Sequence, residues 1–511
     1  MSIVIQKIKS FGLHGIDGYV VDVEVDVARG MPSFTLVGLP DTSIKESRER
    51  VTSAIKNTGF RVPASKIVVN LAPADMRKEG PIYDLAIALG ILASSDDEVL
   101  EQPIHAAGNI AFVGELGLDG ELRRVNGVLP MLLSAKTCGI KRIVIPDGNK
   151  LEASFAEGLE IYSAKNLGDV IEWLRGNDTI TRVQTSSFEQ IKTVTTYGED
   201  LKFVKGQYIA KRALEIAAAG GHNILFIGPP GSGKTMLARC LPTIMPDMTL
   251  DESFEVTKLH SIAGLLSDGI IVKRPFRSPH HTASRVALVG GGTNAKPGEI
   301  SLAHHGVLFL DELPEYPRSC LEVLRQPLED NRITVSRAHA TVEYPASFTL
   351  VASMNPCPCG HFGSRTQKCT CSATNRDRYL RKLSGPLMDR IDLHIEVDNV
   401  TYDDLSSDAN AEPSSNVKSR VETARALQRI RGGFCNAKMT QADVKKFCAI
   451  DANAEKILRN AFEKLQLSAR AYTRILKVAR TIADLENSAT ITPDHITEAI
   501  TYRSLDRKYS L

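Results

Sequence analysis

The alternation of apolar and polar positions divides the first part of the chain into strands and helices. Residues 1–180 contain short runs rich in valine and isoleucine, such as "YVVDVEVDV" and "KIVVNLA", between helical patterns such as "YDLAIALGILASS". Runs of β-branched residues separated by helical periodicity indicate a mixed sheet and helix domain. We therefore expect an α+β or α/β domain over residues 1–180.

The remaining pattern predicts an α/β core followed by a helical domain. Strand and helix patterns alternate again over residues 201–398, and residues 416–511 are almost entirely helical in pattern. In "TRILKVARTIADL" the apolar residues recur at three- and four-residue steps, which places them on one helix face. Polar stretches at 181–200 and 399–415 are typical of linkers.

Composition adds limits to this picture. The 511 residues exceed what a single core usually holds, and 43% hydrophobic with 24% charged residues is ordinary for globular proteins. A net charge of +2 predicts no nucleic-acid partner by itself, so any basic surface must be local. We find no secretory signal and no apolar run of about 18 residues, so we expect no membrane span. Nine cysteines, mostly scattered, are typical of a reduced cytoplasmic protein.

The segment "ILFIGPPGSGKTMLARC" predicts a nucleotide phosphate site. An apolar strand leads into G-x-x-x-x-G-K-[ST] and then a helix. Glycines let the backbone wrap around phosphates, while loop N–H groups and the helix N-terminus supply a positive field. Lys234 would contact the β- and γ-phosphates, and Thr235 would bind Mg²⁺; the alternative is a chance Gly-rich turn. The predicted ATP-binding residues are Gly228, Pro229, Pro230, Gly231, Ser232, Gly233, Lys234, Thr235 and Met236.

Two later strands predict the acidic and polar partners of that phosphate site. The apolar run in "HGVLFLDEL" ends at Asp311 and Glu312. A buried strand here would bring Asp311 to Mg²⁺ and Glu312 to the attacking water; the alternative is an ordinary strand ending in an acidic turn. The strand "ASFTLVASMN" ends at Asn355, at the sheet edge where ligands of open α/β sheets bind. Asn355 would orient the water or sense the γ-phosphate.

Four of the cysteines form a cluster in an insert at 357–371. They are Cys357, Cys359, Cys369 and Cys371, arranged as two Cys-x-Cys pairs. Four thiolates can surround Zn²⁺ tetrahedrally, and the loop between the pairs is long enough to fold back. We favour a structural zinc knuckle, with free thiols or an iron–sulfur centre as alternatives. The chain around the cluster is basic and would present positive charge to DNA, with Arg365, Lys368, Arg376, Arg378, Arg381, Lys382 and Arg390 against only Asp377 and Asp389 over residues 365–390.

The order of these motifs resembles that of the AAA+ ATPases. The phrases "KGQYIAKRALEIAAAGGHN", "FRSPHHTAS", "VASMNPCPCG" and "LMDRIDLHIEV" are similar to the magnesium-chelatase-like branch, and most of all to the ComM/YifB family. The resemblance extends over nearly the whole chain and implies a homo-oligomeric ring of six subunits, with ATP at subunit boundaries. It also implies a DNA helicase that promotes branch migration when incoming DNA recombines during natural transformation. Its partner would be single-stranded or branched DNA. A chelatase-type remodeller of a protein partner, an ATP-dependent protease and a DNA-binding scaffold are the alternatives.

Further site residues follow from the resemblance, position by position. Arg390 in "LMDRIDL" corresponds to the arginine finger, which stabilises transition-state charge in the neighbouring subunit, with a surface salt bridge as the alternative. Arg470 in "LSARAYTRIL" corresponds to the sensor-2 arginine, although Arg474 lies one helical turn away and is not distinguished from it. A solvated helix face is the alternative for both.

The segment "RITVSRAHATVEY" predicts a β-hairpin, which in related ring motors points into the pore. Arg337 and His339 near its tip would contact DNA phosphates, which requires positive charge but no base reading; an ordinary exposed hairpin is the alternative. In "FRSPHHTAS", residues 276–284, we expect the adjacent histidines to point apart, which disfavours a metal site. The segment keeps no assigned role beyond a loop insertion.

Two segments of the first domain resemble the peptidase domain of Lon proteases, a fold of the ribosomal S5 domain 2 type. They are "ADMRKEGPIYDLAIALGIL" and "GELGLDGELRRVNGVLPMLLSAK". Lon uses a Ser/Lys dyad, but the corresponding positions here carry Ile82 and Leu129. The resemblance therefore implies a Lon-like fold without proteolysis, used for ring assembly or DNA binding.

Overall fold

The computed structural model describes most of the chain as two compact units. The described residues are 5–95, 109–192, 197–267, 269–292, 295–337, 340–363, 367–400, 411–465, 467–503 and 505. The first unit comprises the chain up to residue 194 together with residues 253–271, and the second comprises residues 195–252 and everything from 272 onward. Each unit has its own hydrophobic core. Within the described part of the chain, every helix is too short or too polar to cross a bilayer.

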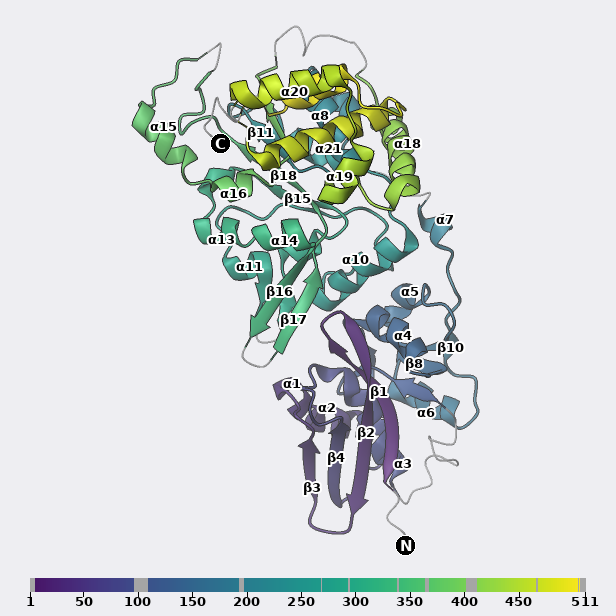
Figure 1. Ribbon diagram of the computed structural model, residues 1–511. Coiled ribbons are helices and arrows are strands. Elements are labelled where there is room, and N and C mark those ends of the chain that lie inside the picture. The colour runs from purple at the N-terminus through teal and green to yellow at the C-terminus, as the bar shows by residue number, and fades with distance from the viewer. Residues whose placement is uncertain are drawn as a thin grey trace. The chain divides into compact units, whose positions relative to one another are not determined.

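The first unit contains an eight-stranded sheet of order β10-β9-β8-β5-β1-β2-β4-β3. Strands β1 (Gln6–His14), β2 (Asp17–Ala28) and β4 (Lys66–Ala72) pair antiparallel and lie side by side (Figure 1). Every second residue of β2 from Val21 to Val25 is buried, as the alternating pattern predicts for a strand with one covered face. The other strands are β3 (Ser33–Val37), β5 (Ile110–Phe112), β8 (Arg142–Pro146), β9 (Glu160–Ala164) and β10 (Thr181–Arg182), with a separate ribbon of β6 (Glu115–Leu116) and β7 (Leu122–Arg123).

The helices of the first unit include one that is buried nearly all round. Helix α3 (Asp84–Ala93) buries every residue from Asp84 to Leu92, which explains why its sequence is apolar throughout rather than along one stripe. The others are α1 (Thr42–Lys45), α2 (Ser47–Asn57), α4 (Val128–Thr137), α5 (Lys150–Ala153), α6 (Leu167–Leu174) and α7 (Phe188–Lys192). Helix α10 (Leu250–Ala263) contributes its residues from Ser253 onward to this unit.

The second unit is built on a five-stranded parallel sheet of order β12-β15-β18-β11-β19. Its strands are β11 (Ile224–Ile227), β12 (Phe276–Arg277), β15 (Val307–Leu310), β18 (Thr349–Met354) and β19 (Leu393–Glu396). The three central strands are buried along their whole length, in keeping with their continuous apolar sequences. Because all five strands are parallel, the loops that follow them emerge at one edge of the sheet.

Helices cover this sheet, and the last of them ends at Thr501 (Figure 1). Those before and within the core are α8 (Tyr208–Gly220), α9 (Lys234–Ile244), α11 (Arg285–Val289), α12 (Glu299–Leu302), α13 (Arg318–Glu322), α14 (Arg325–Asp330), α15 (Ala373–Leu380) and α16 (Gly385–Met388). Those of the predicted helical domain are α18 (Ser414–Gly432), α19 (Gln441–Phe447), α20 (Ala452–Leu465), α21 (Ala469–Leu485) and α22 (Pro493–Thr501). Helix α21 buries Ile475, Val478 and Ile482 in the same core that contains β11 and α8. The boundaries predicted at 398 and 416 stay predictions, since one core joins the two parts.

Two small antiparallel ribbons complete the second unit. Strands β16 (Arg332–Arg337) and β17 (Ala340–Pro345) form the hairpin that the sequence predicts. The hairpin projects away from the C-terminal helices α20 and α21 (Figure 1). Strands β13 (Gly290–Gly291) and β14 (Lys296–Pro297) form the second ribbon.

Candidate active site

The Gly-rich loop connects the end of β11 to the start of α9. Gly231 and Gly233 have φ of 77° and 85°, a region that side chains disfavour, so the curl of the loop requires glycine there. A Cβ on Gly228 would lie 2.1 Å from the carbonyl oxygen of Val397, so this glycine permits close packing of the loop against the chain after β19. The sequence motif therefore forms a strand, a tight loop and a helix in the arrangement that binds phosphate groups.

Lys234 is the first residue of α9, directly after this loop, and its ammonium is held at the sheet edge. Its Nζ donates to the carbonyl oxygens of Gly228 at 2.8 Å and Pro229 at 2.7 Å, and Asn355 Oδ1 lies 3.4 Å away. Burial lowers the pKa of Lys234, while the nearby carboxylates of Asp311 and Glu312 act to raise it. The structure thus brings together a lysine and an asparagine that lie 121 positions apart in the sequence.

Thr235 and Asp311 form a pair of oxygen donors beside Lys234. The Thr235 hydroxyl donates to Asp311 Oδ2 at 3.1 Å. A hydroxyl and a carboxylate are the hard oxygen ligands that Mg²⁺ prefers, so the two predicted metal ligands fit the ion. Ser353, buried on β18, donates to the other oxygen of Asp311. Sequence reasoning missed Ser353, although a hydroxyl inside the apolar strand "TLVASM", two positions before Asn355, was a usable signal.

Glu312 adopts an uncommon backbone conformation directly after Asp311. Its φ of 53° and ψ of 48° lie in the left-handed region, which a non-glycine residue occupies only when its surroundings enforce it. Its N–H donates to Asp311 Oδ1 at 3.1 Å and to Ser353 Oγ at 3.4 Å. The Glu312 side chain is 53% exposed, so its carboxylate can meet a water molecule at the same edge as Lys234.

The predicted arginine finger is buried within its own chain. Arg390 is 7% exposed, forms an ion pair with Glu329 and donates to the carbonyl oxygen of Pro386. Among the described residues, its Nε has no hydrogen-bond partner. The alternative considered for Arg390, a surface salt bridge, agrees with the ion pair to Glu329 but not with the burial of the guanidinium.

The two sensor-2 candidates have different surroundings. Arg470 is 63% exposed and lies 3.3 Å from Asp389. Arg474 forms an ion pair with the buried Asp392, which also bonds His222 Nδ1 at 2.9 Å. Arg474 is thus committed to an internal network, whereas Arg470 has an accessible guanidinium beside the residue that precedes Arg390.

The four cysteines of the insert converge. Their sulfur atoms all lie within 4.8 Å of one another. The Sγ–Sγ distances are 3.4 Å for Cys357–Cys359, 3.7 Å for Cys357–Cys369 and 3.6 Å for Cys359–Cys369. A tetrahedral zinc with Zn–S bonds of about 2.3 Å has sulfur atoms about 3.8 Å apart. The cluster is therefore compatible with a zinc ion.

The thiols are surrounded by backbone donors. Burial raises the pKa of Cys357 to about 12. Burial also acts to raise the pKa of Cys359, but hydrogen bonds from the backbone at His361 and Thr370 outweigh it and lower that pKa to about 5. A thiolate stabilised by N–H groups beside neutral thiols is a donor set that attracts a soft divalent cation.

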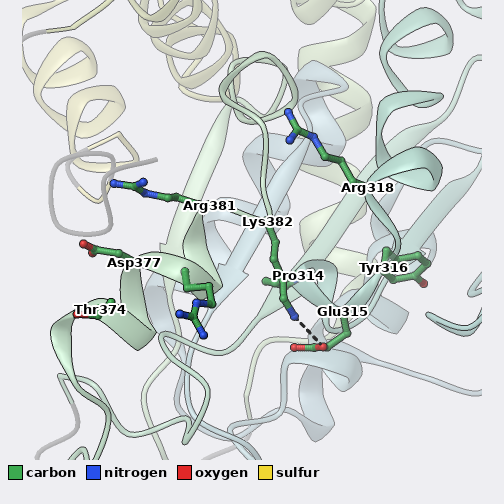
Figure 2. Close-up of a pocket in the computed structure, with 9 residues that line it drawn as sticks. Pro314, Glu315, Tyr316, Arg318, Thr374, Asp377, Arg381 and Lys382 are labelled. Carbon is green, nitrogen blue, oxygen red and sulfur yellow. Dashed lines mark hydrogen bonds and ion pairs between the residues drawn. The ribbon is translucent and has the colours of Figure 1, made fainter.

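A basic cavity of about 620 Å³ lies where α15 faces the segment after Glu312. Figure 2 shows Lys382 pointing to Glu315, whose carboxylate is 3.1 Å from Nζ, whereas Arg318 and Arg381 point elsewhere. Within the described part of the chain, Arg318, Arg378 and Arg381 have no acidic partner at ion-pair distance. The cavity is lined by Pro314, Glu315, Tyr316, Arg318, Thr374, Asp377, Arg378, Arg381 and Lys382. Unpaired guanidinium groups on a concave surface suit phosphate-bearing ligands.

The predicted DNA contacts cannot be placed in the same way. His339 and the side chain of Arg337 lie outside the described residues, as does Arg365 of the basic segment. The base of the hairpin is well anchored, because Ile333 and Val335 are buried and Tyr344 Oη donates to the carbonyl oxygen of Ala295 at 2.9 Å.

The positions that correspond to the Lon dyad lie in the core of the first unit. Ile82 and Leu129 are both buried. Nearby in sequence, Lys78 is also buried, and its Nζ donates to the carbonyl oxygen of Met76 at 2.8 Å. Asp84 is buried too and pairs with Arg50 Nε at 2.7 Å. Lys78 and Asp84 thus have separate partners inside the fold, and the dyad positions themselves carry the apolar side chains of Ile82 and Leu129.

Comparisons with known proteins agree with this geometry. Successive parts of the chain match the family models "Magnesium chelatase, subunit ChlI" at residues 200–405, "Subunit ChlI of Mg-chelatase" at 23–149 and "Magnesium chelatase, subunit ChlI C-terminal" at 411–503. The chain is 45% identical over 498 residues to "Competence protein ComM" of Haemophilus influenzae, covering 96% of both. It is 43% identical over 495 residues to "Uncharacterized protein YifB" of Escherichia coli, again covering 96% of both.

The first domain has a more distant relative. A "Lon protease" of Lachnoclostridium phytofermentans is 25% identical over 169 residues, which cover 31% of this chain and 20% of that protein. The α/β class, with a Lon-like α+β domain, an AAA+ core and a helical C-terminus, is thereby confirmed. The family also implies an ATPase that uses ATP with Mg²⁺ and that assembles into oligomers. The chain belongs to the magnesium-chelatase-like AAA+ ATPases of the ComM/YifB family.

Proposed function

We propose that the protein is an ATP-driven DNA motor, a hexameric helicase that promotes branch migration when incoming DNA recombines during natural transformation. The main support is the 45% identity over nearly the full length to a protein named for competence. The observation that carries the motor itself is the convergence of Lys234, Asp311 and Asn355 at one sheet edge. Its site of action would be the cytoplasm.

Hydrolysis would use the residues of that edge in distinct roles. Lys234 binds the β- and γ-phosphates, with Asn355 close enough to orient the water. Thr235 and Asp311 hold Mg²⁺, which when bound neutralises developing phosphate charge. Glu312 would accept a proton from the water whose oxygen attacks the γ-phosphorus, while the bond from that phosphorus to the β–γ bridging oxygen breaks and ADP leaves.

A neighbouring subunit would complete the site. Arg390 would leave its ion pair with Glu329 and insert into the next subunit's site, where it stabilises charge in the transition state. Arg470 would act as sensor 2 because its guanidinium is accessible, while Arg474 holds the buried Asp392. These roles predict that a lone subunit hydrolyses ATP more slowly than an assembled ring.

DNA would be held through its phosphates. The predicted contacts at Arg337 and His339 belong to the projecting hairpin, and the unpaired guanidiniums of Arg318 and Arg381 add positive charge in the cavity beside the ATP site. Contacts of this kind carry no sequence code, as a motor that moves along any DNA requires.

The insert would hold one structural zinc per chain through Cys357, Cys359, Cys369 and Cys371. Arg376 connects it to α15, since its guanidinium lies 4.5 Å from the Phe362 ring centroid and donates to the carbonyl oxygen of Cys371 at 3.0 Å. Metal analysis of the purified protein should find about one zinc per chain, and Cys369→Ser should remove it. Metal-free protein with full activity would reject this assignment.

A junction-unwinding assay tests the proposed function directly. The wild type should separate a four-way DNA junction with ATP, and Lys234→Ala should not. ATP hydrolysis should also rise when DNA is added. An ATPase that ignores DNA and leaves the junction intact would favour the alternative, a chelatase-type remodeller of a protein partner.

A further inference from the structure

The segment "FRSPHHTAS", to which the sequence assigned no role, lies beside the acid at the active site. His281 Nδ1 is 3.4 Å from Glu312 Oε2. The expectation that the two histidines point apart is wrong, because the rings of His280 and His281 lie against each other with centroids 4.1 Å apart. Neither ring belongs to a group of possible metal ligands among the described residues. The segment is therefore placed to act on Glu312 rather than on a metal.

Contacts on both sides of His281 fix its position. Tyr316, four residues after Glu312, donates its hydroxyl to the carbonyl oxygen of Pro279 at 2.5 Å. Cys320 Sγ lies 3.7 Å from the carbonyl oxygen of Ala283. The His281 ring meets the Tyr316 ring edge-on, with centroids 6.4 Å apart. The backbone that carries His281 is thus tied to the segment that follows Glu312, so contacts other than their own hold the two residues near each other.

The Glu312 carboxylate has few other restraints. Its backbone N–H is held by Asp311 and Ser353, but the side chain is 53% exposed. Within the described part of the chain, His281 is the one side chain found within ion-pair distance of that carboxylate. The His281 side chain is 30% exposed, so it is better held than the acid it meets.

We propose that His281 is a positioning residue for ATP hydrolysis: its Nδ1–H donates to the Glu312 carboxylate and holds it in the orientation that accepts the proton of the attacking water. This inference rests on the proposed role of Glu312 as the acid that activates water. A carboxylate free to rotate would spend less time in the productive orientation, and misplacement of a catalytic group by about 1 Å costs up to roughly 100-fold in rate.

The proposal predicts which kinetic constant changes. Among the described residues, no hydrogen bond or ion pair joins His281 to Lys234 or Thr235, the residues that would bind the nucleotide and its metal. Its loss should therefore lower kcat by roughly 10-fold and leave KM for ATP unchanged, as expected for an interaction that acts on the chemical step alone.

The experiment compares four variants of the full-length protein. His281→Ala removes the donor. His281→Asn returns an amide N–H close to the place of Nδ1, whereas His281→Gln extends its amide toward the place of Nε2. His280→Ala is the matched control, because its Nδ1 bonds the Thr282 hydroxyl at 2.8 Å instead of Glu312. ATP hydrolysis is measured over a range of ATP concentrations, with binding of a fluorescent ATP analogue and thermal unfolding recorded for each variant.

We expect the highest kcat for the wild type and His280→Ala, and a kcat within about 3-fold of the wild type for His281→Asn. His281→Gln should be slower, and His281→Ala should be the slowest. All variants should bind the ATP analogue equally. The proposal fails if His281→Ala keeps the wild-type kcat, if its loss lies in KM, or if Asn restores no more than Ala in a variant that unfolds at the wild-type temperature. An equal loss in His280→Ala would also overturn it, since ring packing would then be the cause. Failure of the Glu312 role itself is seen separately, as wild-type turnover by Glu312→Gln.

Discussion

Each unit of the molecule contains a buried lysine, and only one of the two lies in a site. Lys78 in the first unit is 0% exposed and Lys234 in the second is 8% exposed, and burial lowers the pKa of both. Both ammonium groups donate to main-chain carbonyls. Lys234, however, directly follows a Gly-rich loop and lies close to Asp311 and Asn355. Burial and a shifted pKa therefore do not define a site; the groups arranged around the ammonium do.

The Lon-like unit teaches the same lesson at the level of the fold. Its relationship to Lon proteases is detectable, yet Ile82 and Leu129 fill the dyad positions and are buried in its core. The packing of such a domain requires no nucleophile or base at these positions, so a shared fold does not imply a shared activity.

The largest expected loss of ATP hydrolysis comes from a substitution in the candidate ATP site. Glu312→Gln should lower turnover by roughly 1,000-fold, because the amide cannot accept the proton of the attacking water, while ATP binding persists. Steady-state hydrolysis and binding of a fluorescent ATP analogue measure the two. Glu315→Gln is the matched control, since that carboxylate pairs with Lys382 rather than reaching the phosphate site. Wild-type hydrolysis by Glu312→Gln would contradict the site assignment.

A pair of substitutions tests whether the two buried lysines differ in their effect on ATP hydrolysis. Lys234→Ala should reduce hydrolysis by roughly 100-fold or more, because a preorganised charge on the phosphates is lost. Lys78→Met should change hydrolysis by less than about 2-fold, because replacing a buried charge by an apolar side chain of similar size is often neutral for the fold. ATPase rates and thermal unfolding of both variants provide the readout. If Lys78→Met folds and yet loses hydrolysis, the first unit takes part in the ATPase reaction.

A smaller effect sharpens the contrast between buried and exposed charge within α21. Arg474→Ala should lower the free energy of unfolding by roughly 3 kcal/mol, because it leaves the charge of Asp392 buried without its partner. Arg470→Ala should cost less than about 1 kcal/mol, since Arg470 is 63% exposed. Chemical denaturation measures both, and equal costs would show that Arg470 is structural as well.

The smallest effect is a dependence of this network on pH. Burial acts to raise the pKa of Asp392, but Arg474 and His222 outweigh it and lower that pKa. A carboxyl whose pKa is lowered by folding stabilises the protein above its unfolded value of about 3.9 and loses that contribution as the pH falls through the lower folded value. Acid should therefore destabilise the wild type more steeply below about pH 4 than it does Arg474→Ala. Parallel acid titrations followed by circular dichroism provide the comparison.

The local motifs of the site could be predicted from the sequence, whereas contacts between separate segments could not. The P-loop, Asp311 and Asn355 each follow an apolar run, and the ends of parallel strands meet at one edge. The approach of the cysteines follows from short spacing. The pairs His281–Glu312 and Arg390–Glu329, in contrast, join segments whose relative placement no periodicity reports. The left-handed backbone of Glu312 was also hidden, because no glycine marks it.

The single hydrophobic core of the second unit limits how this unit can be divided into shorter fragments. Helices α18 and α21 bury Val421 and Ile482 among the residues of α8, α9 and β11. A fragment ending before α18 would leave the apolar sides of α8 and α9 facing water, and such a surface promotes aggregation. The P-loop sheet and the C-terminal helices should therefore melt in a single cooperative transition, and a minimal ATPase cut from this chain must keep its last hundred or so residues to fold at all.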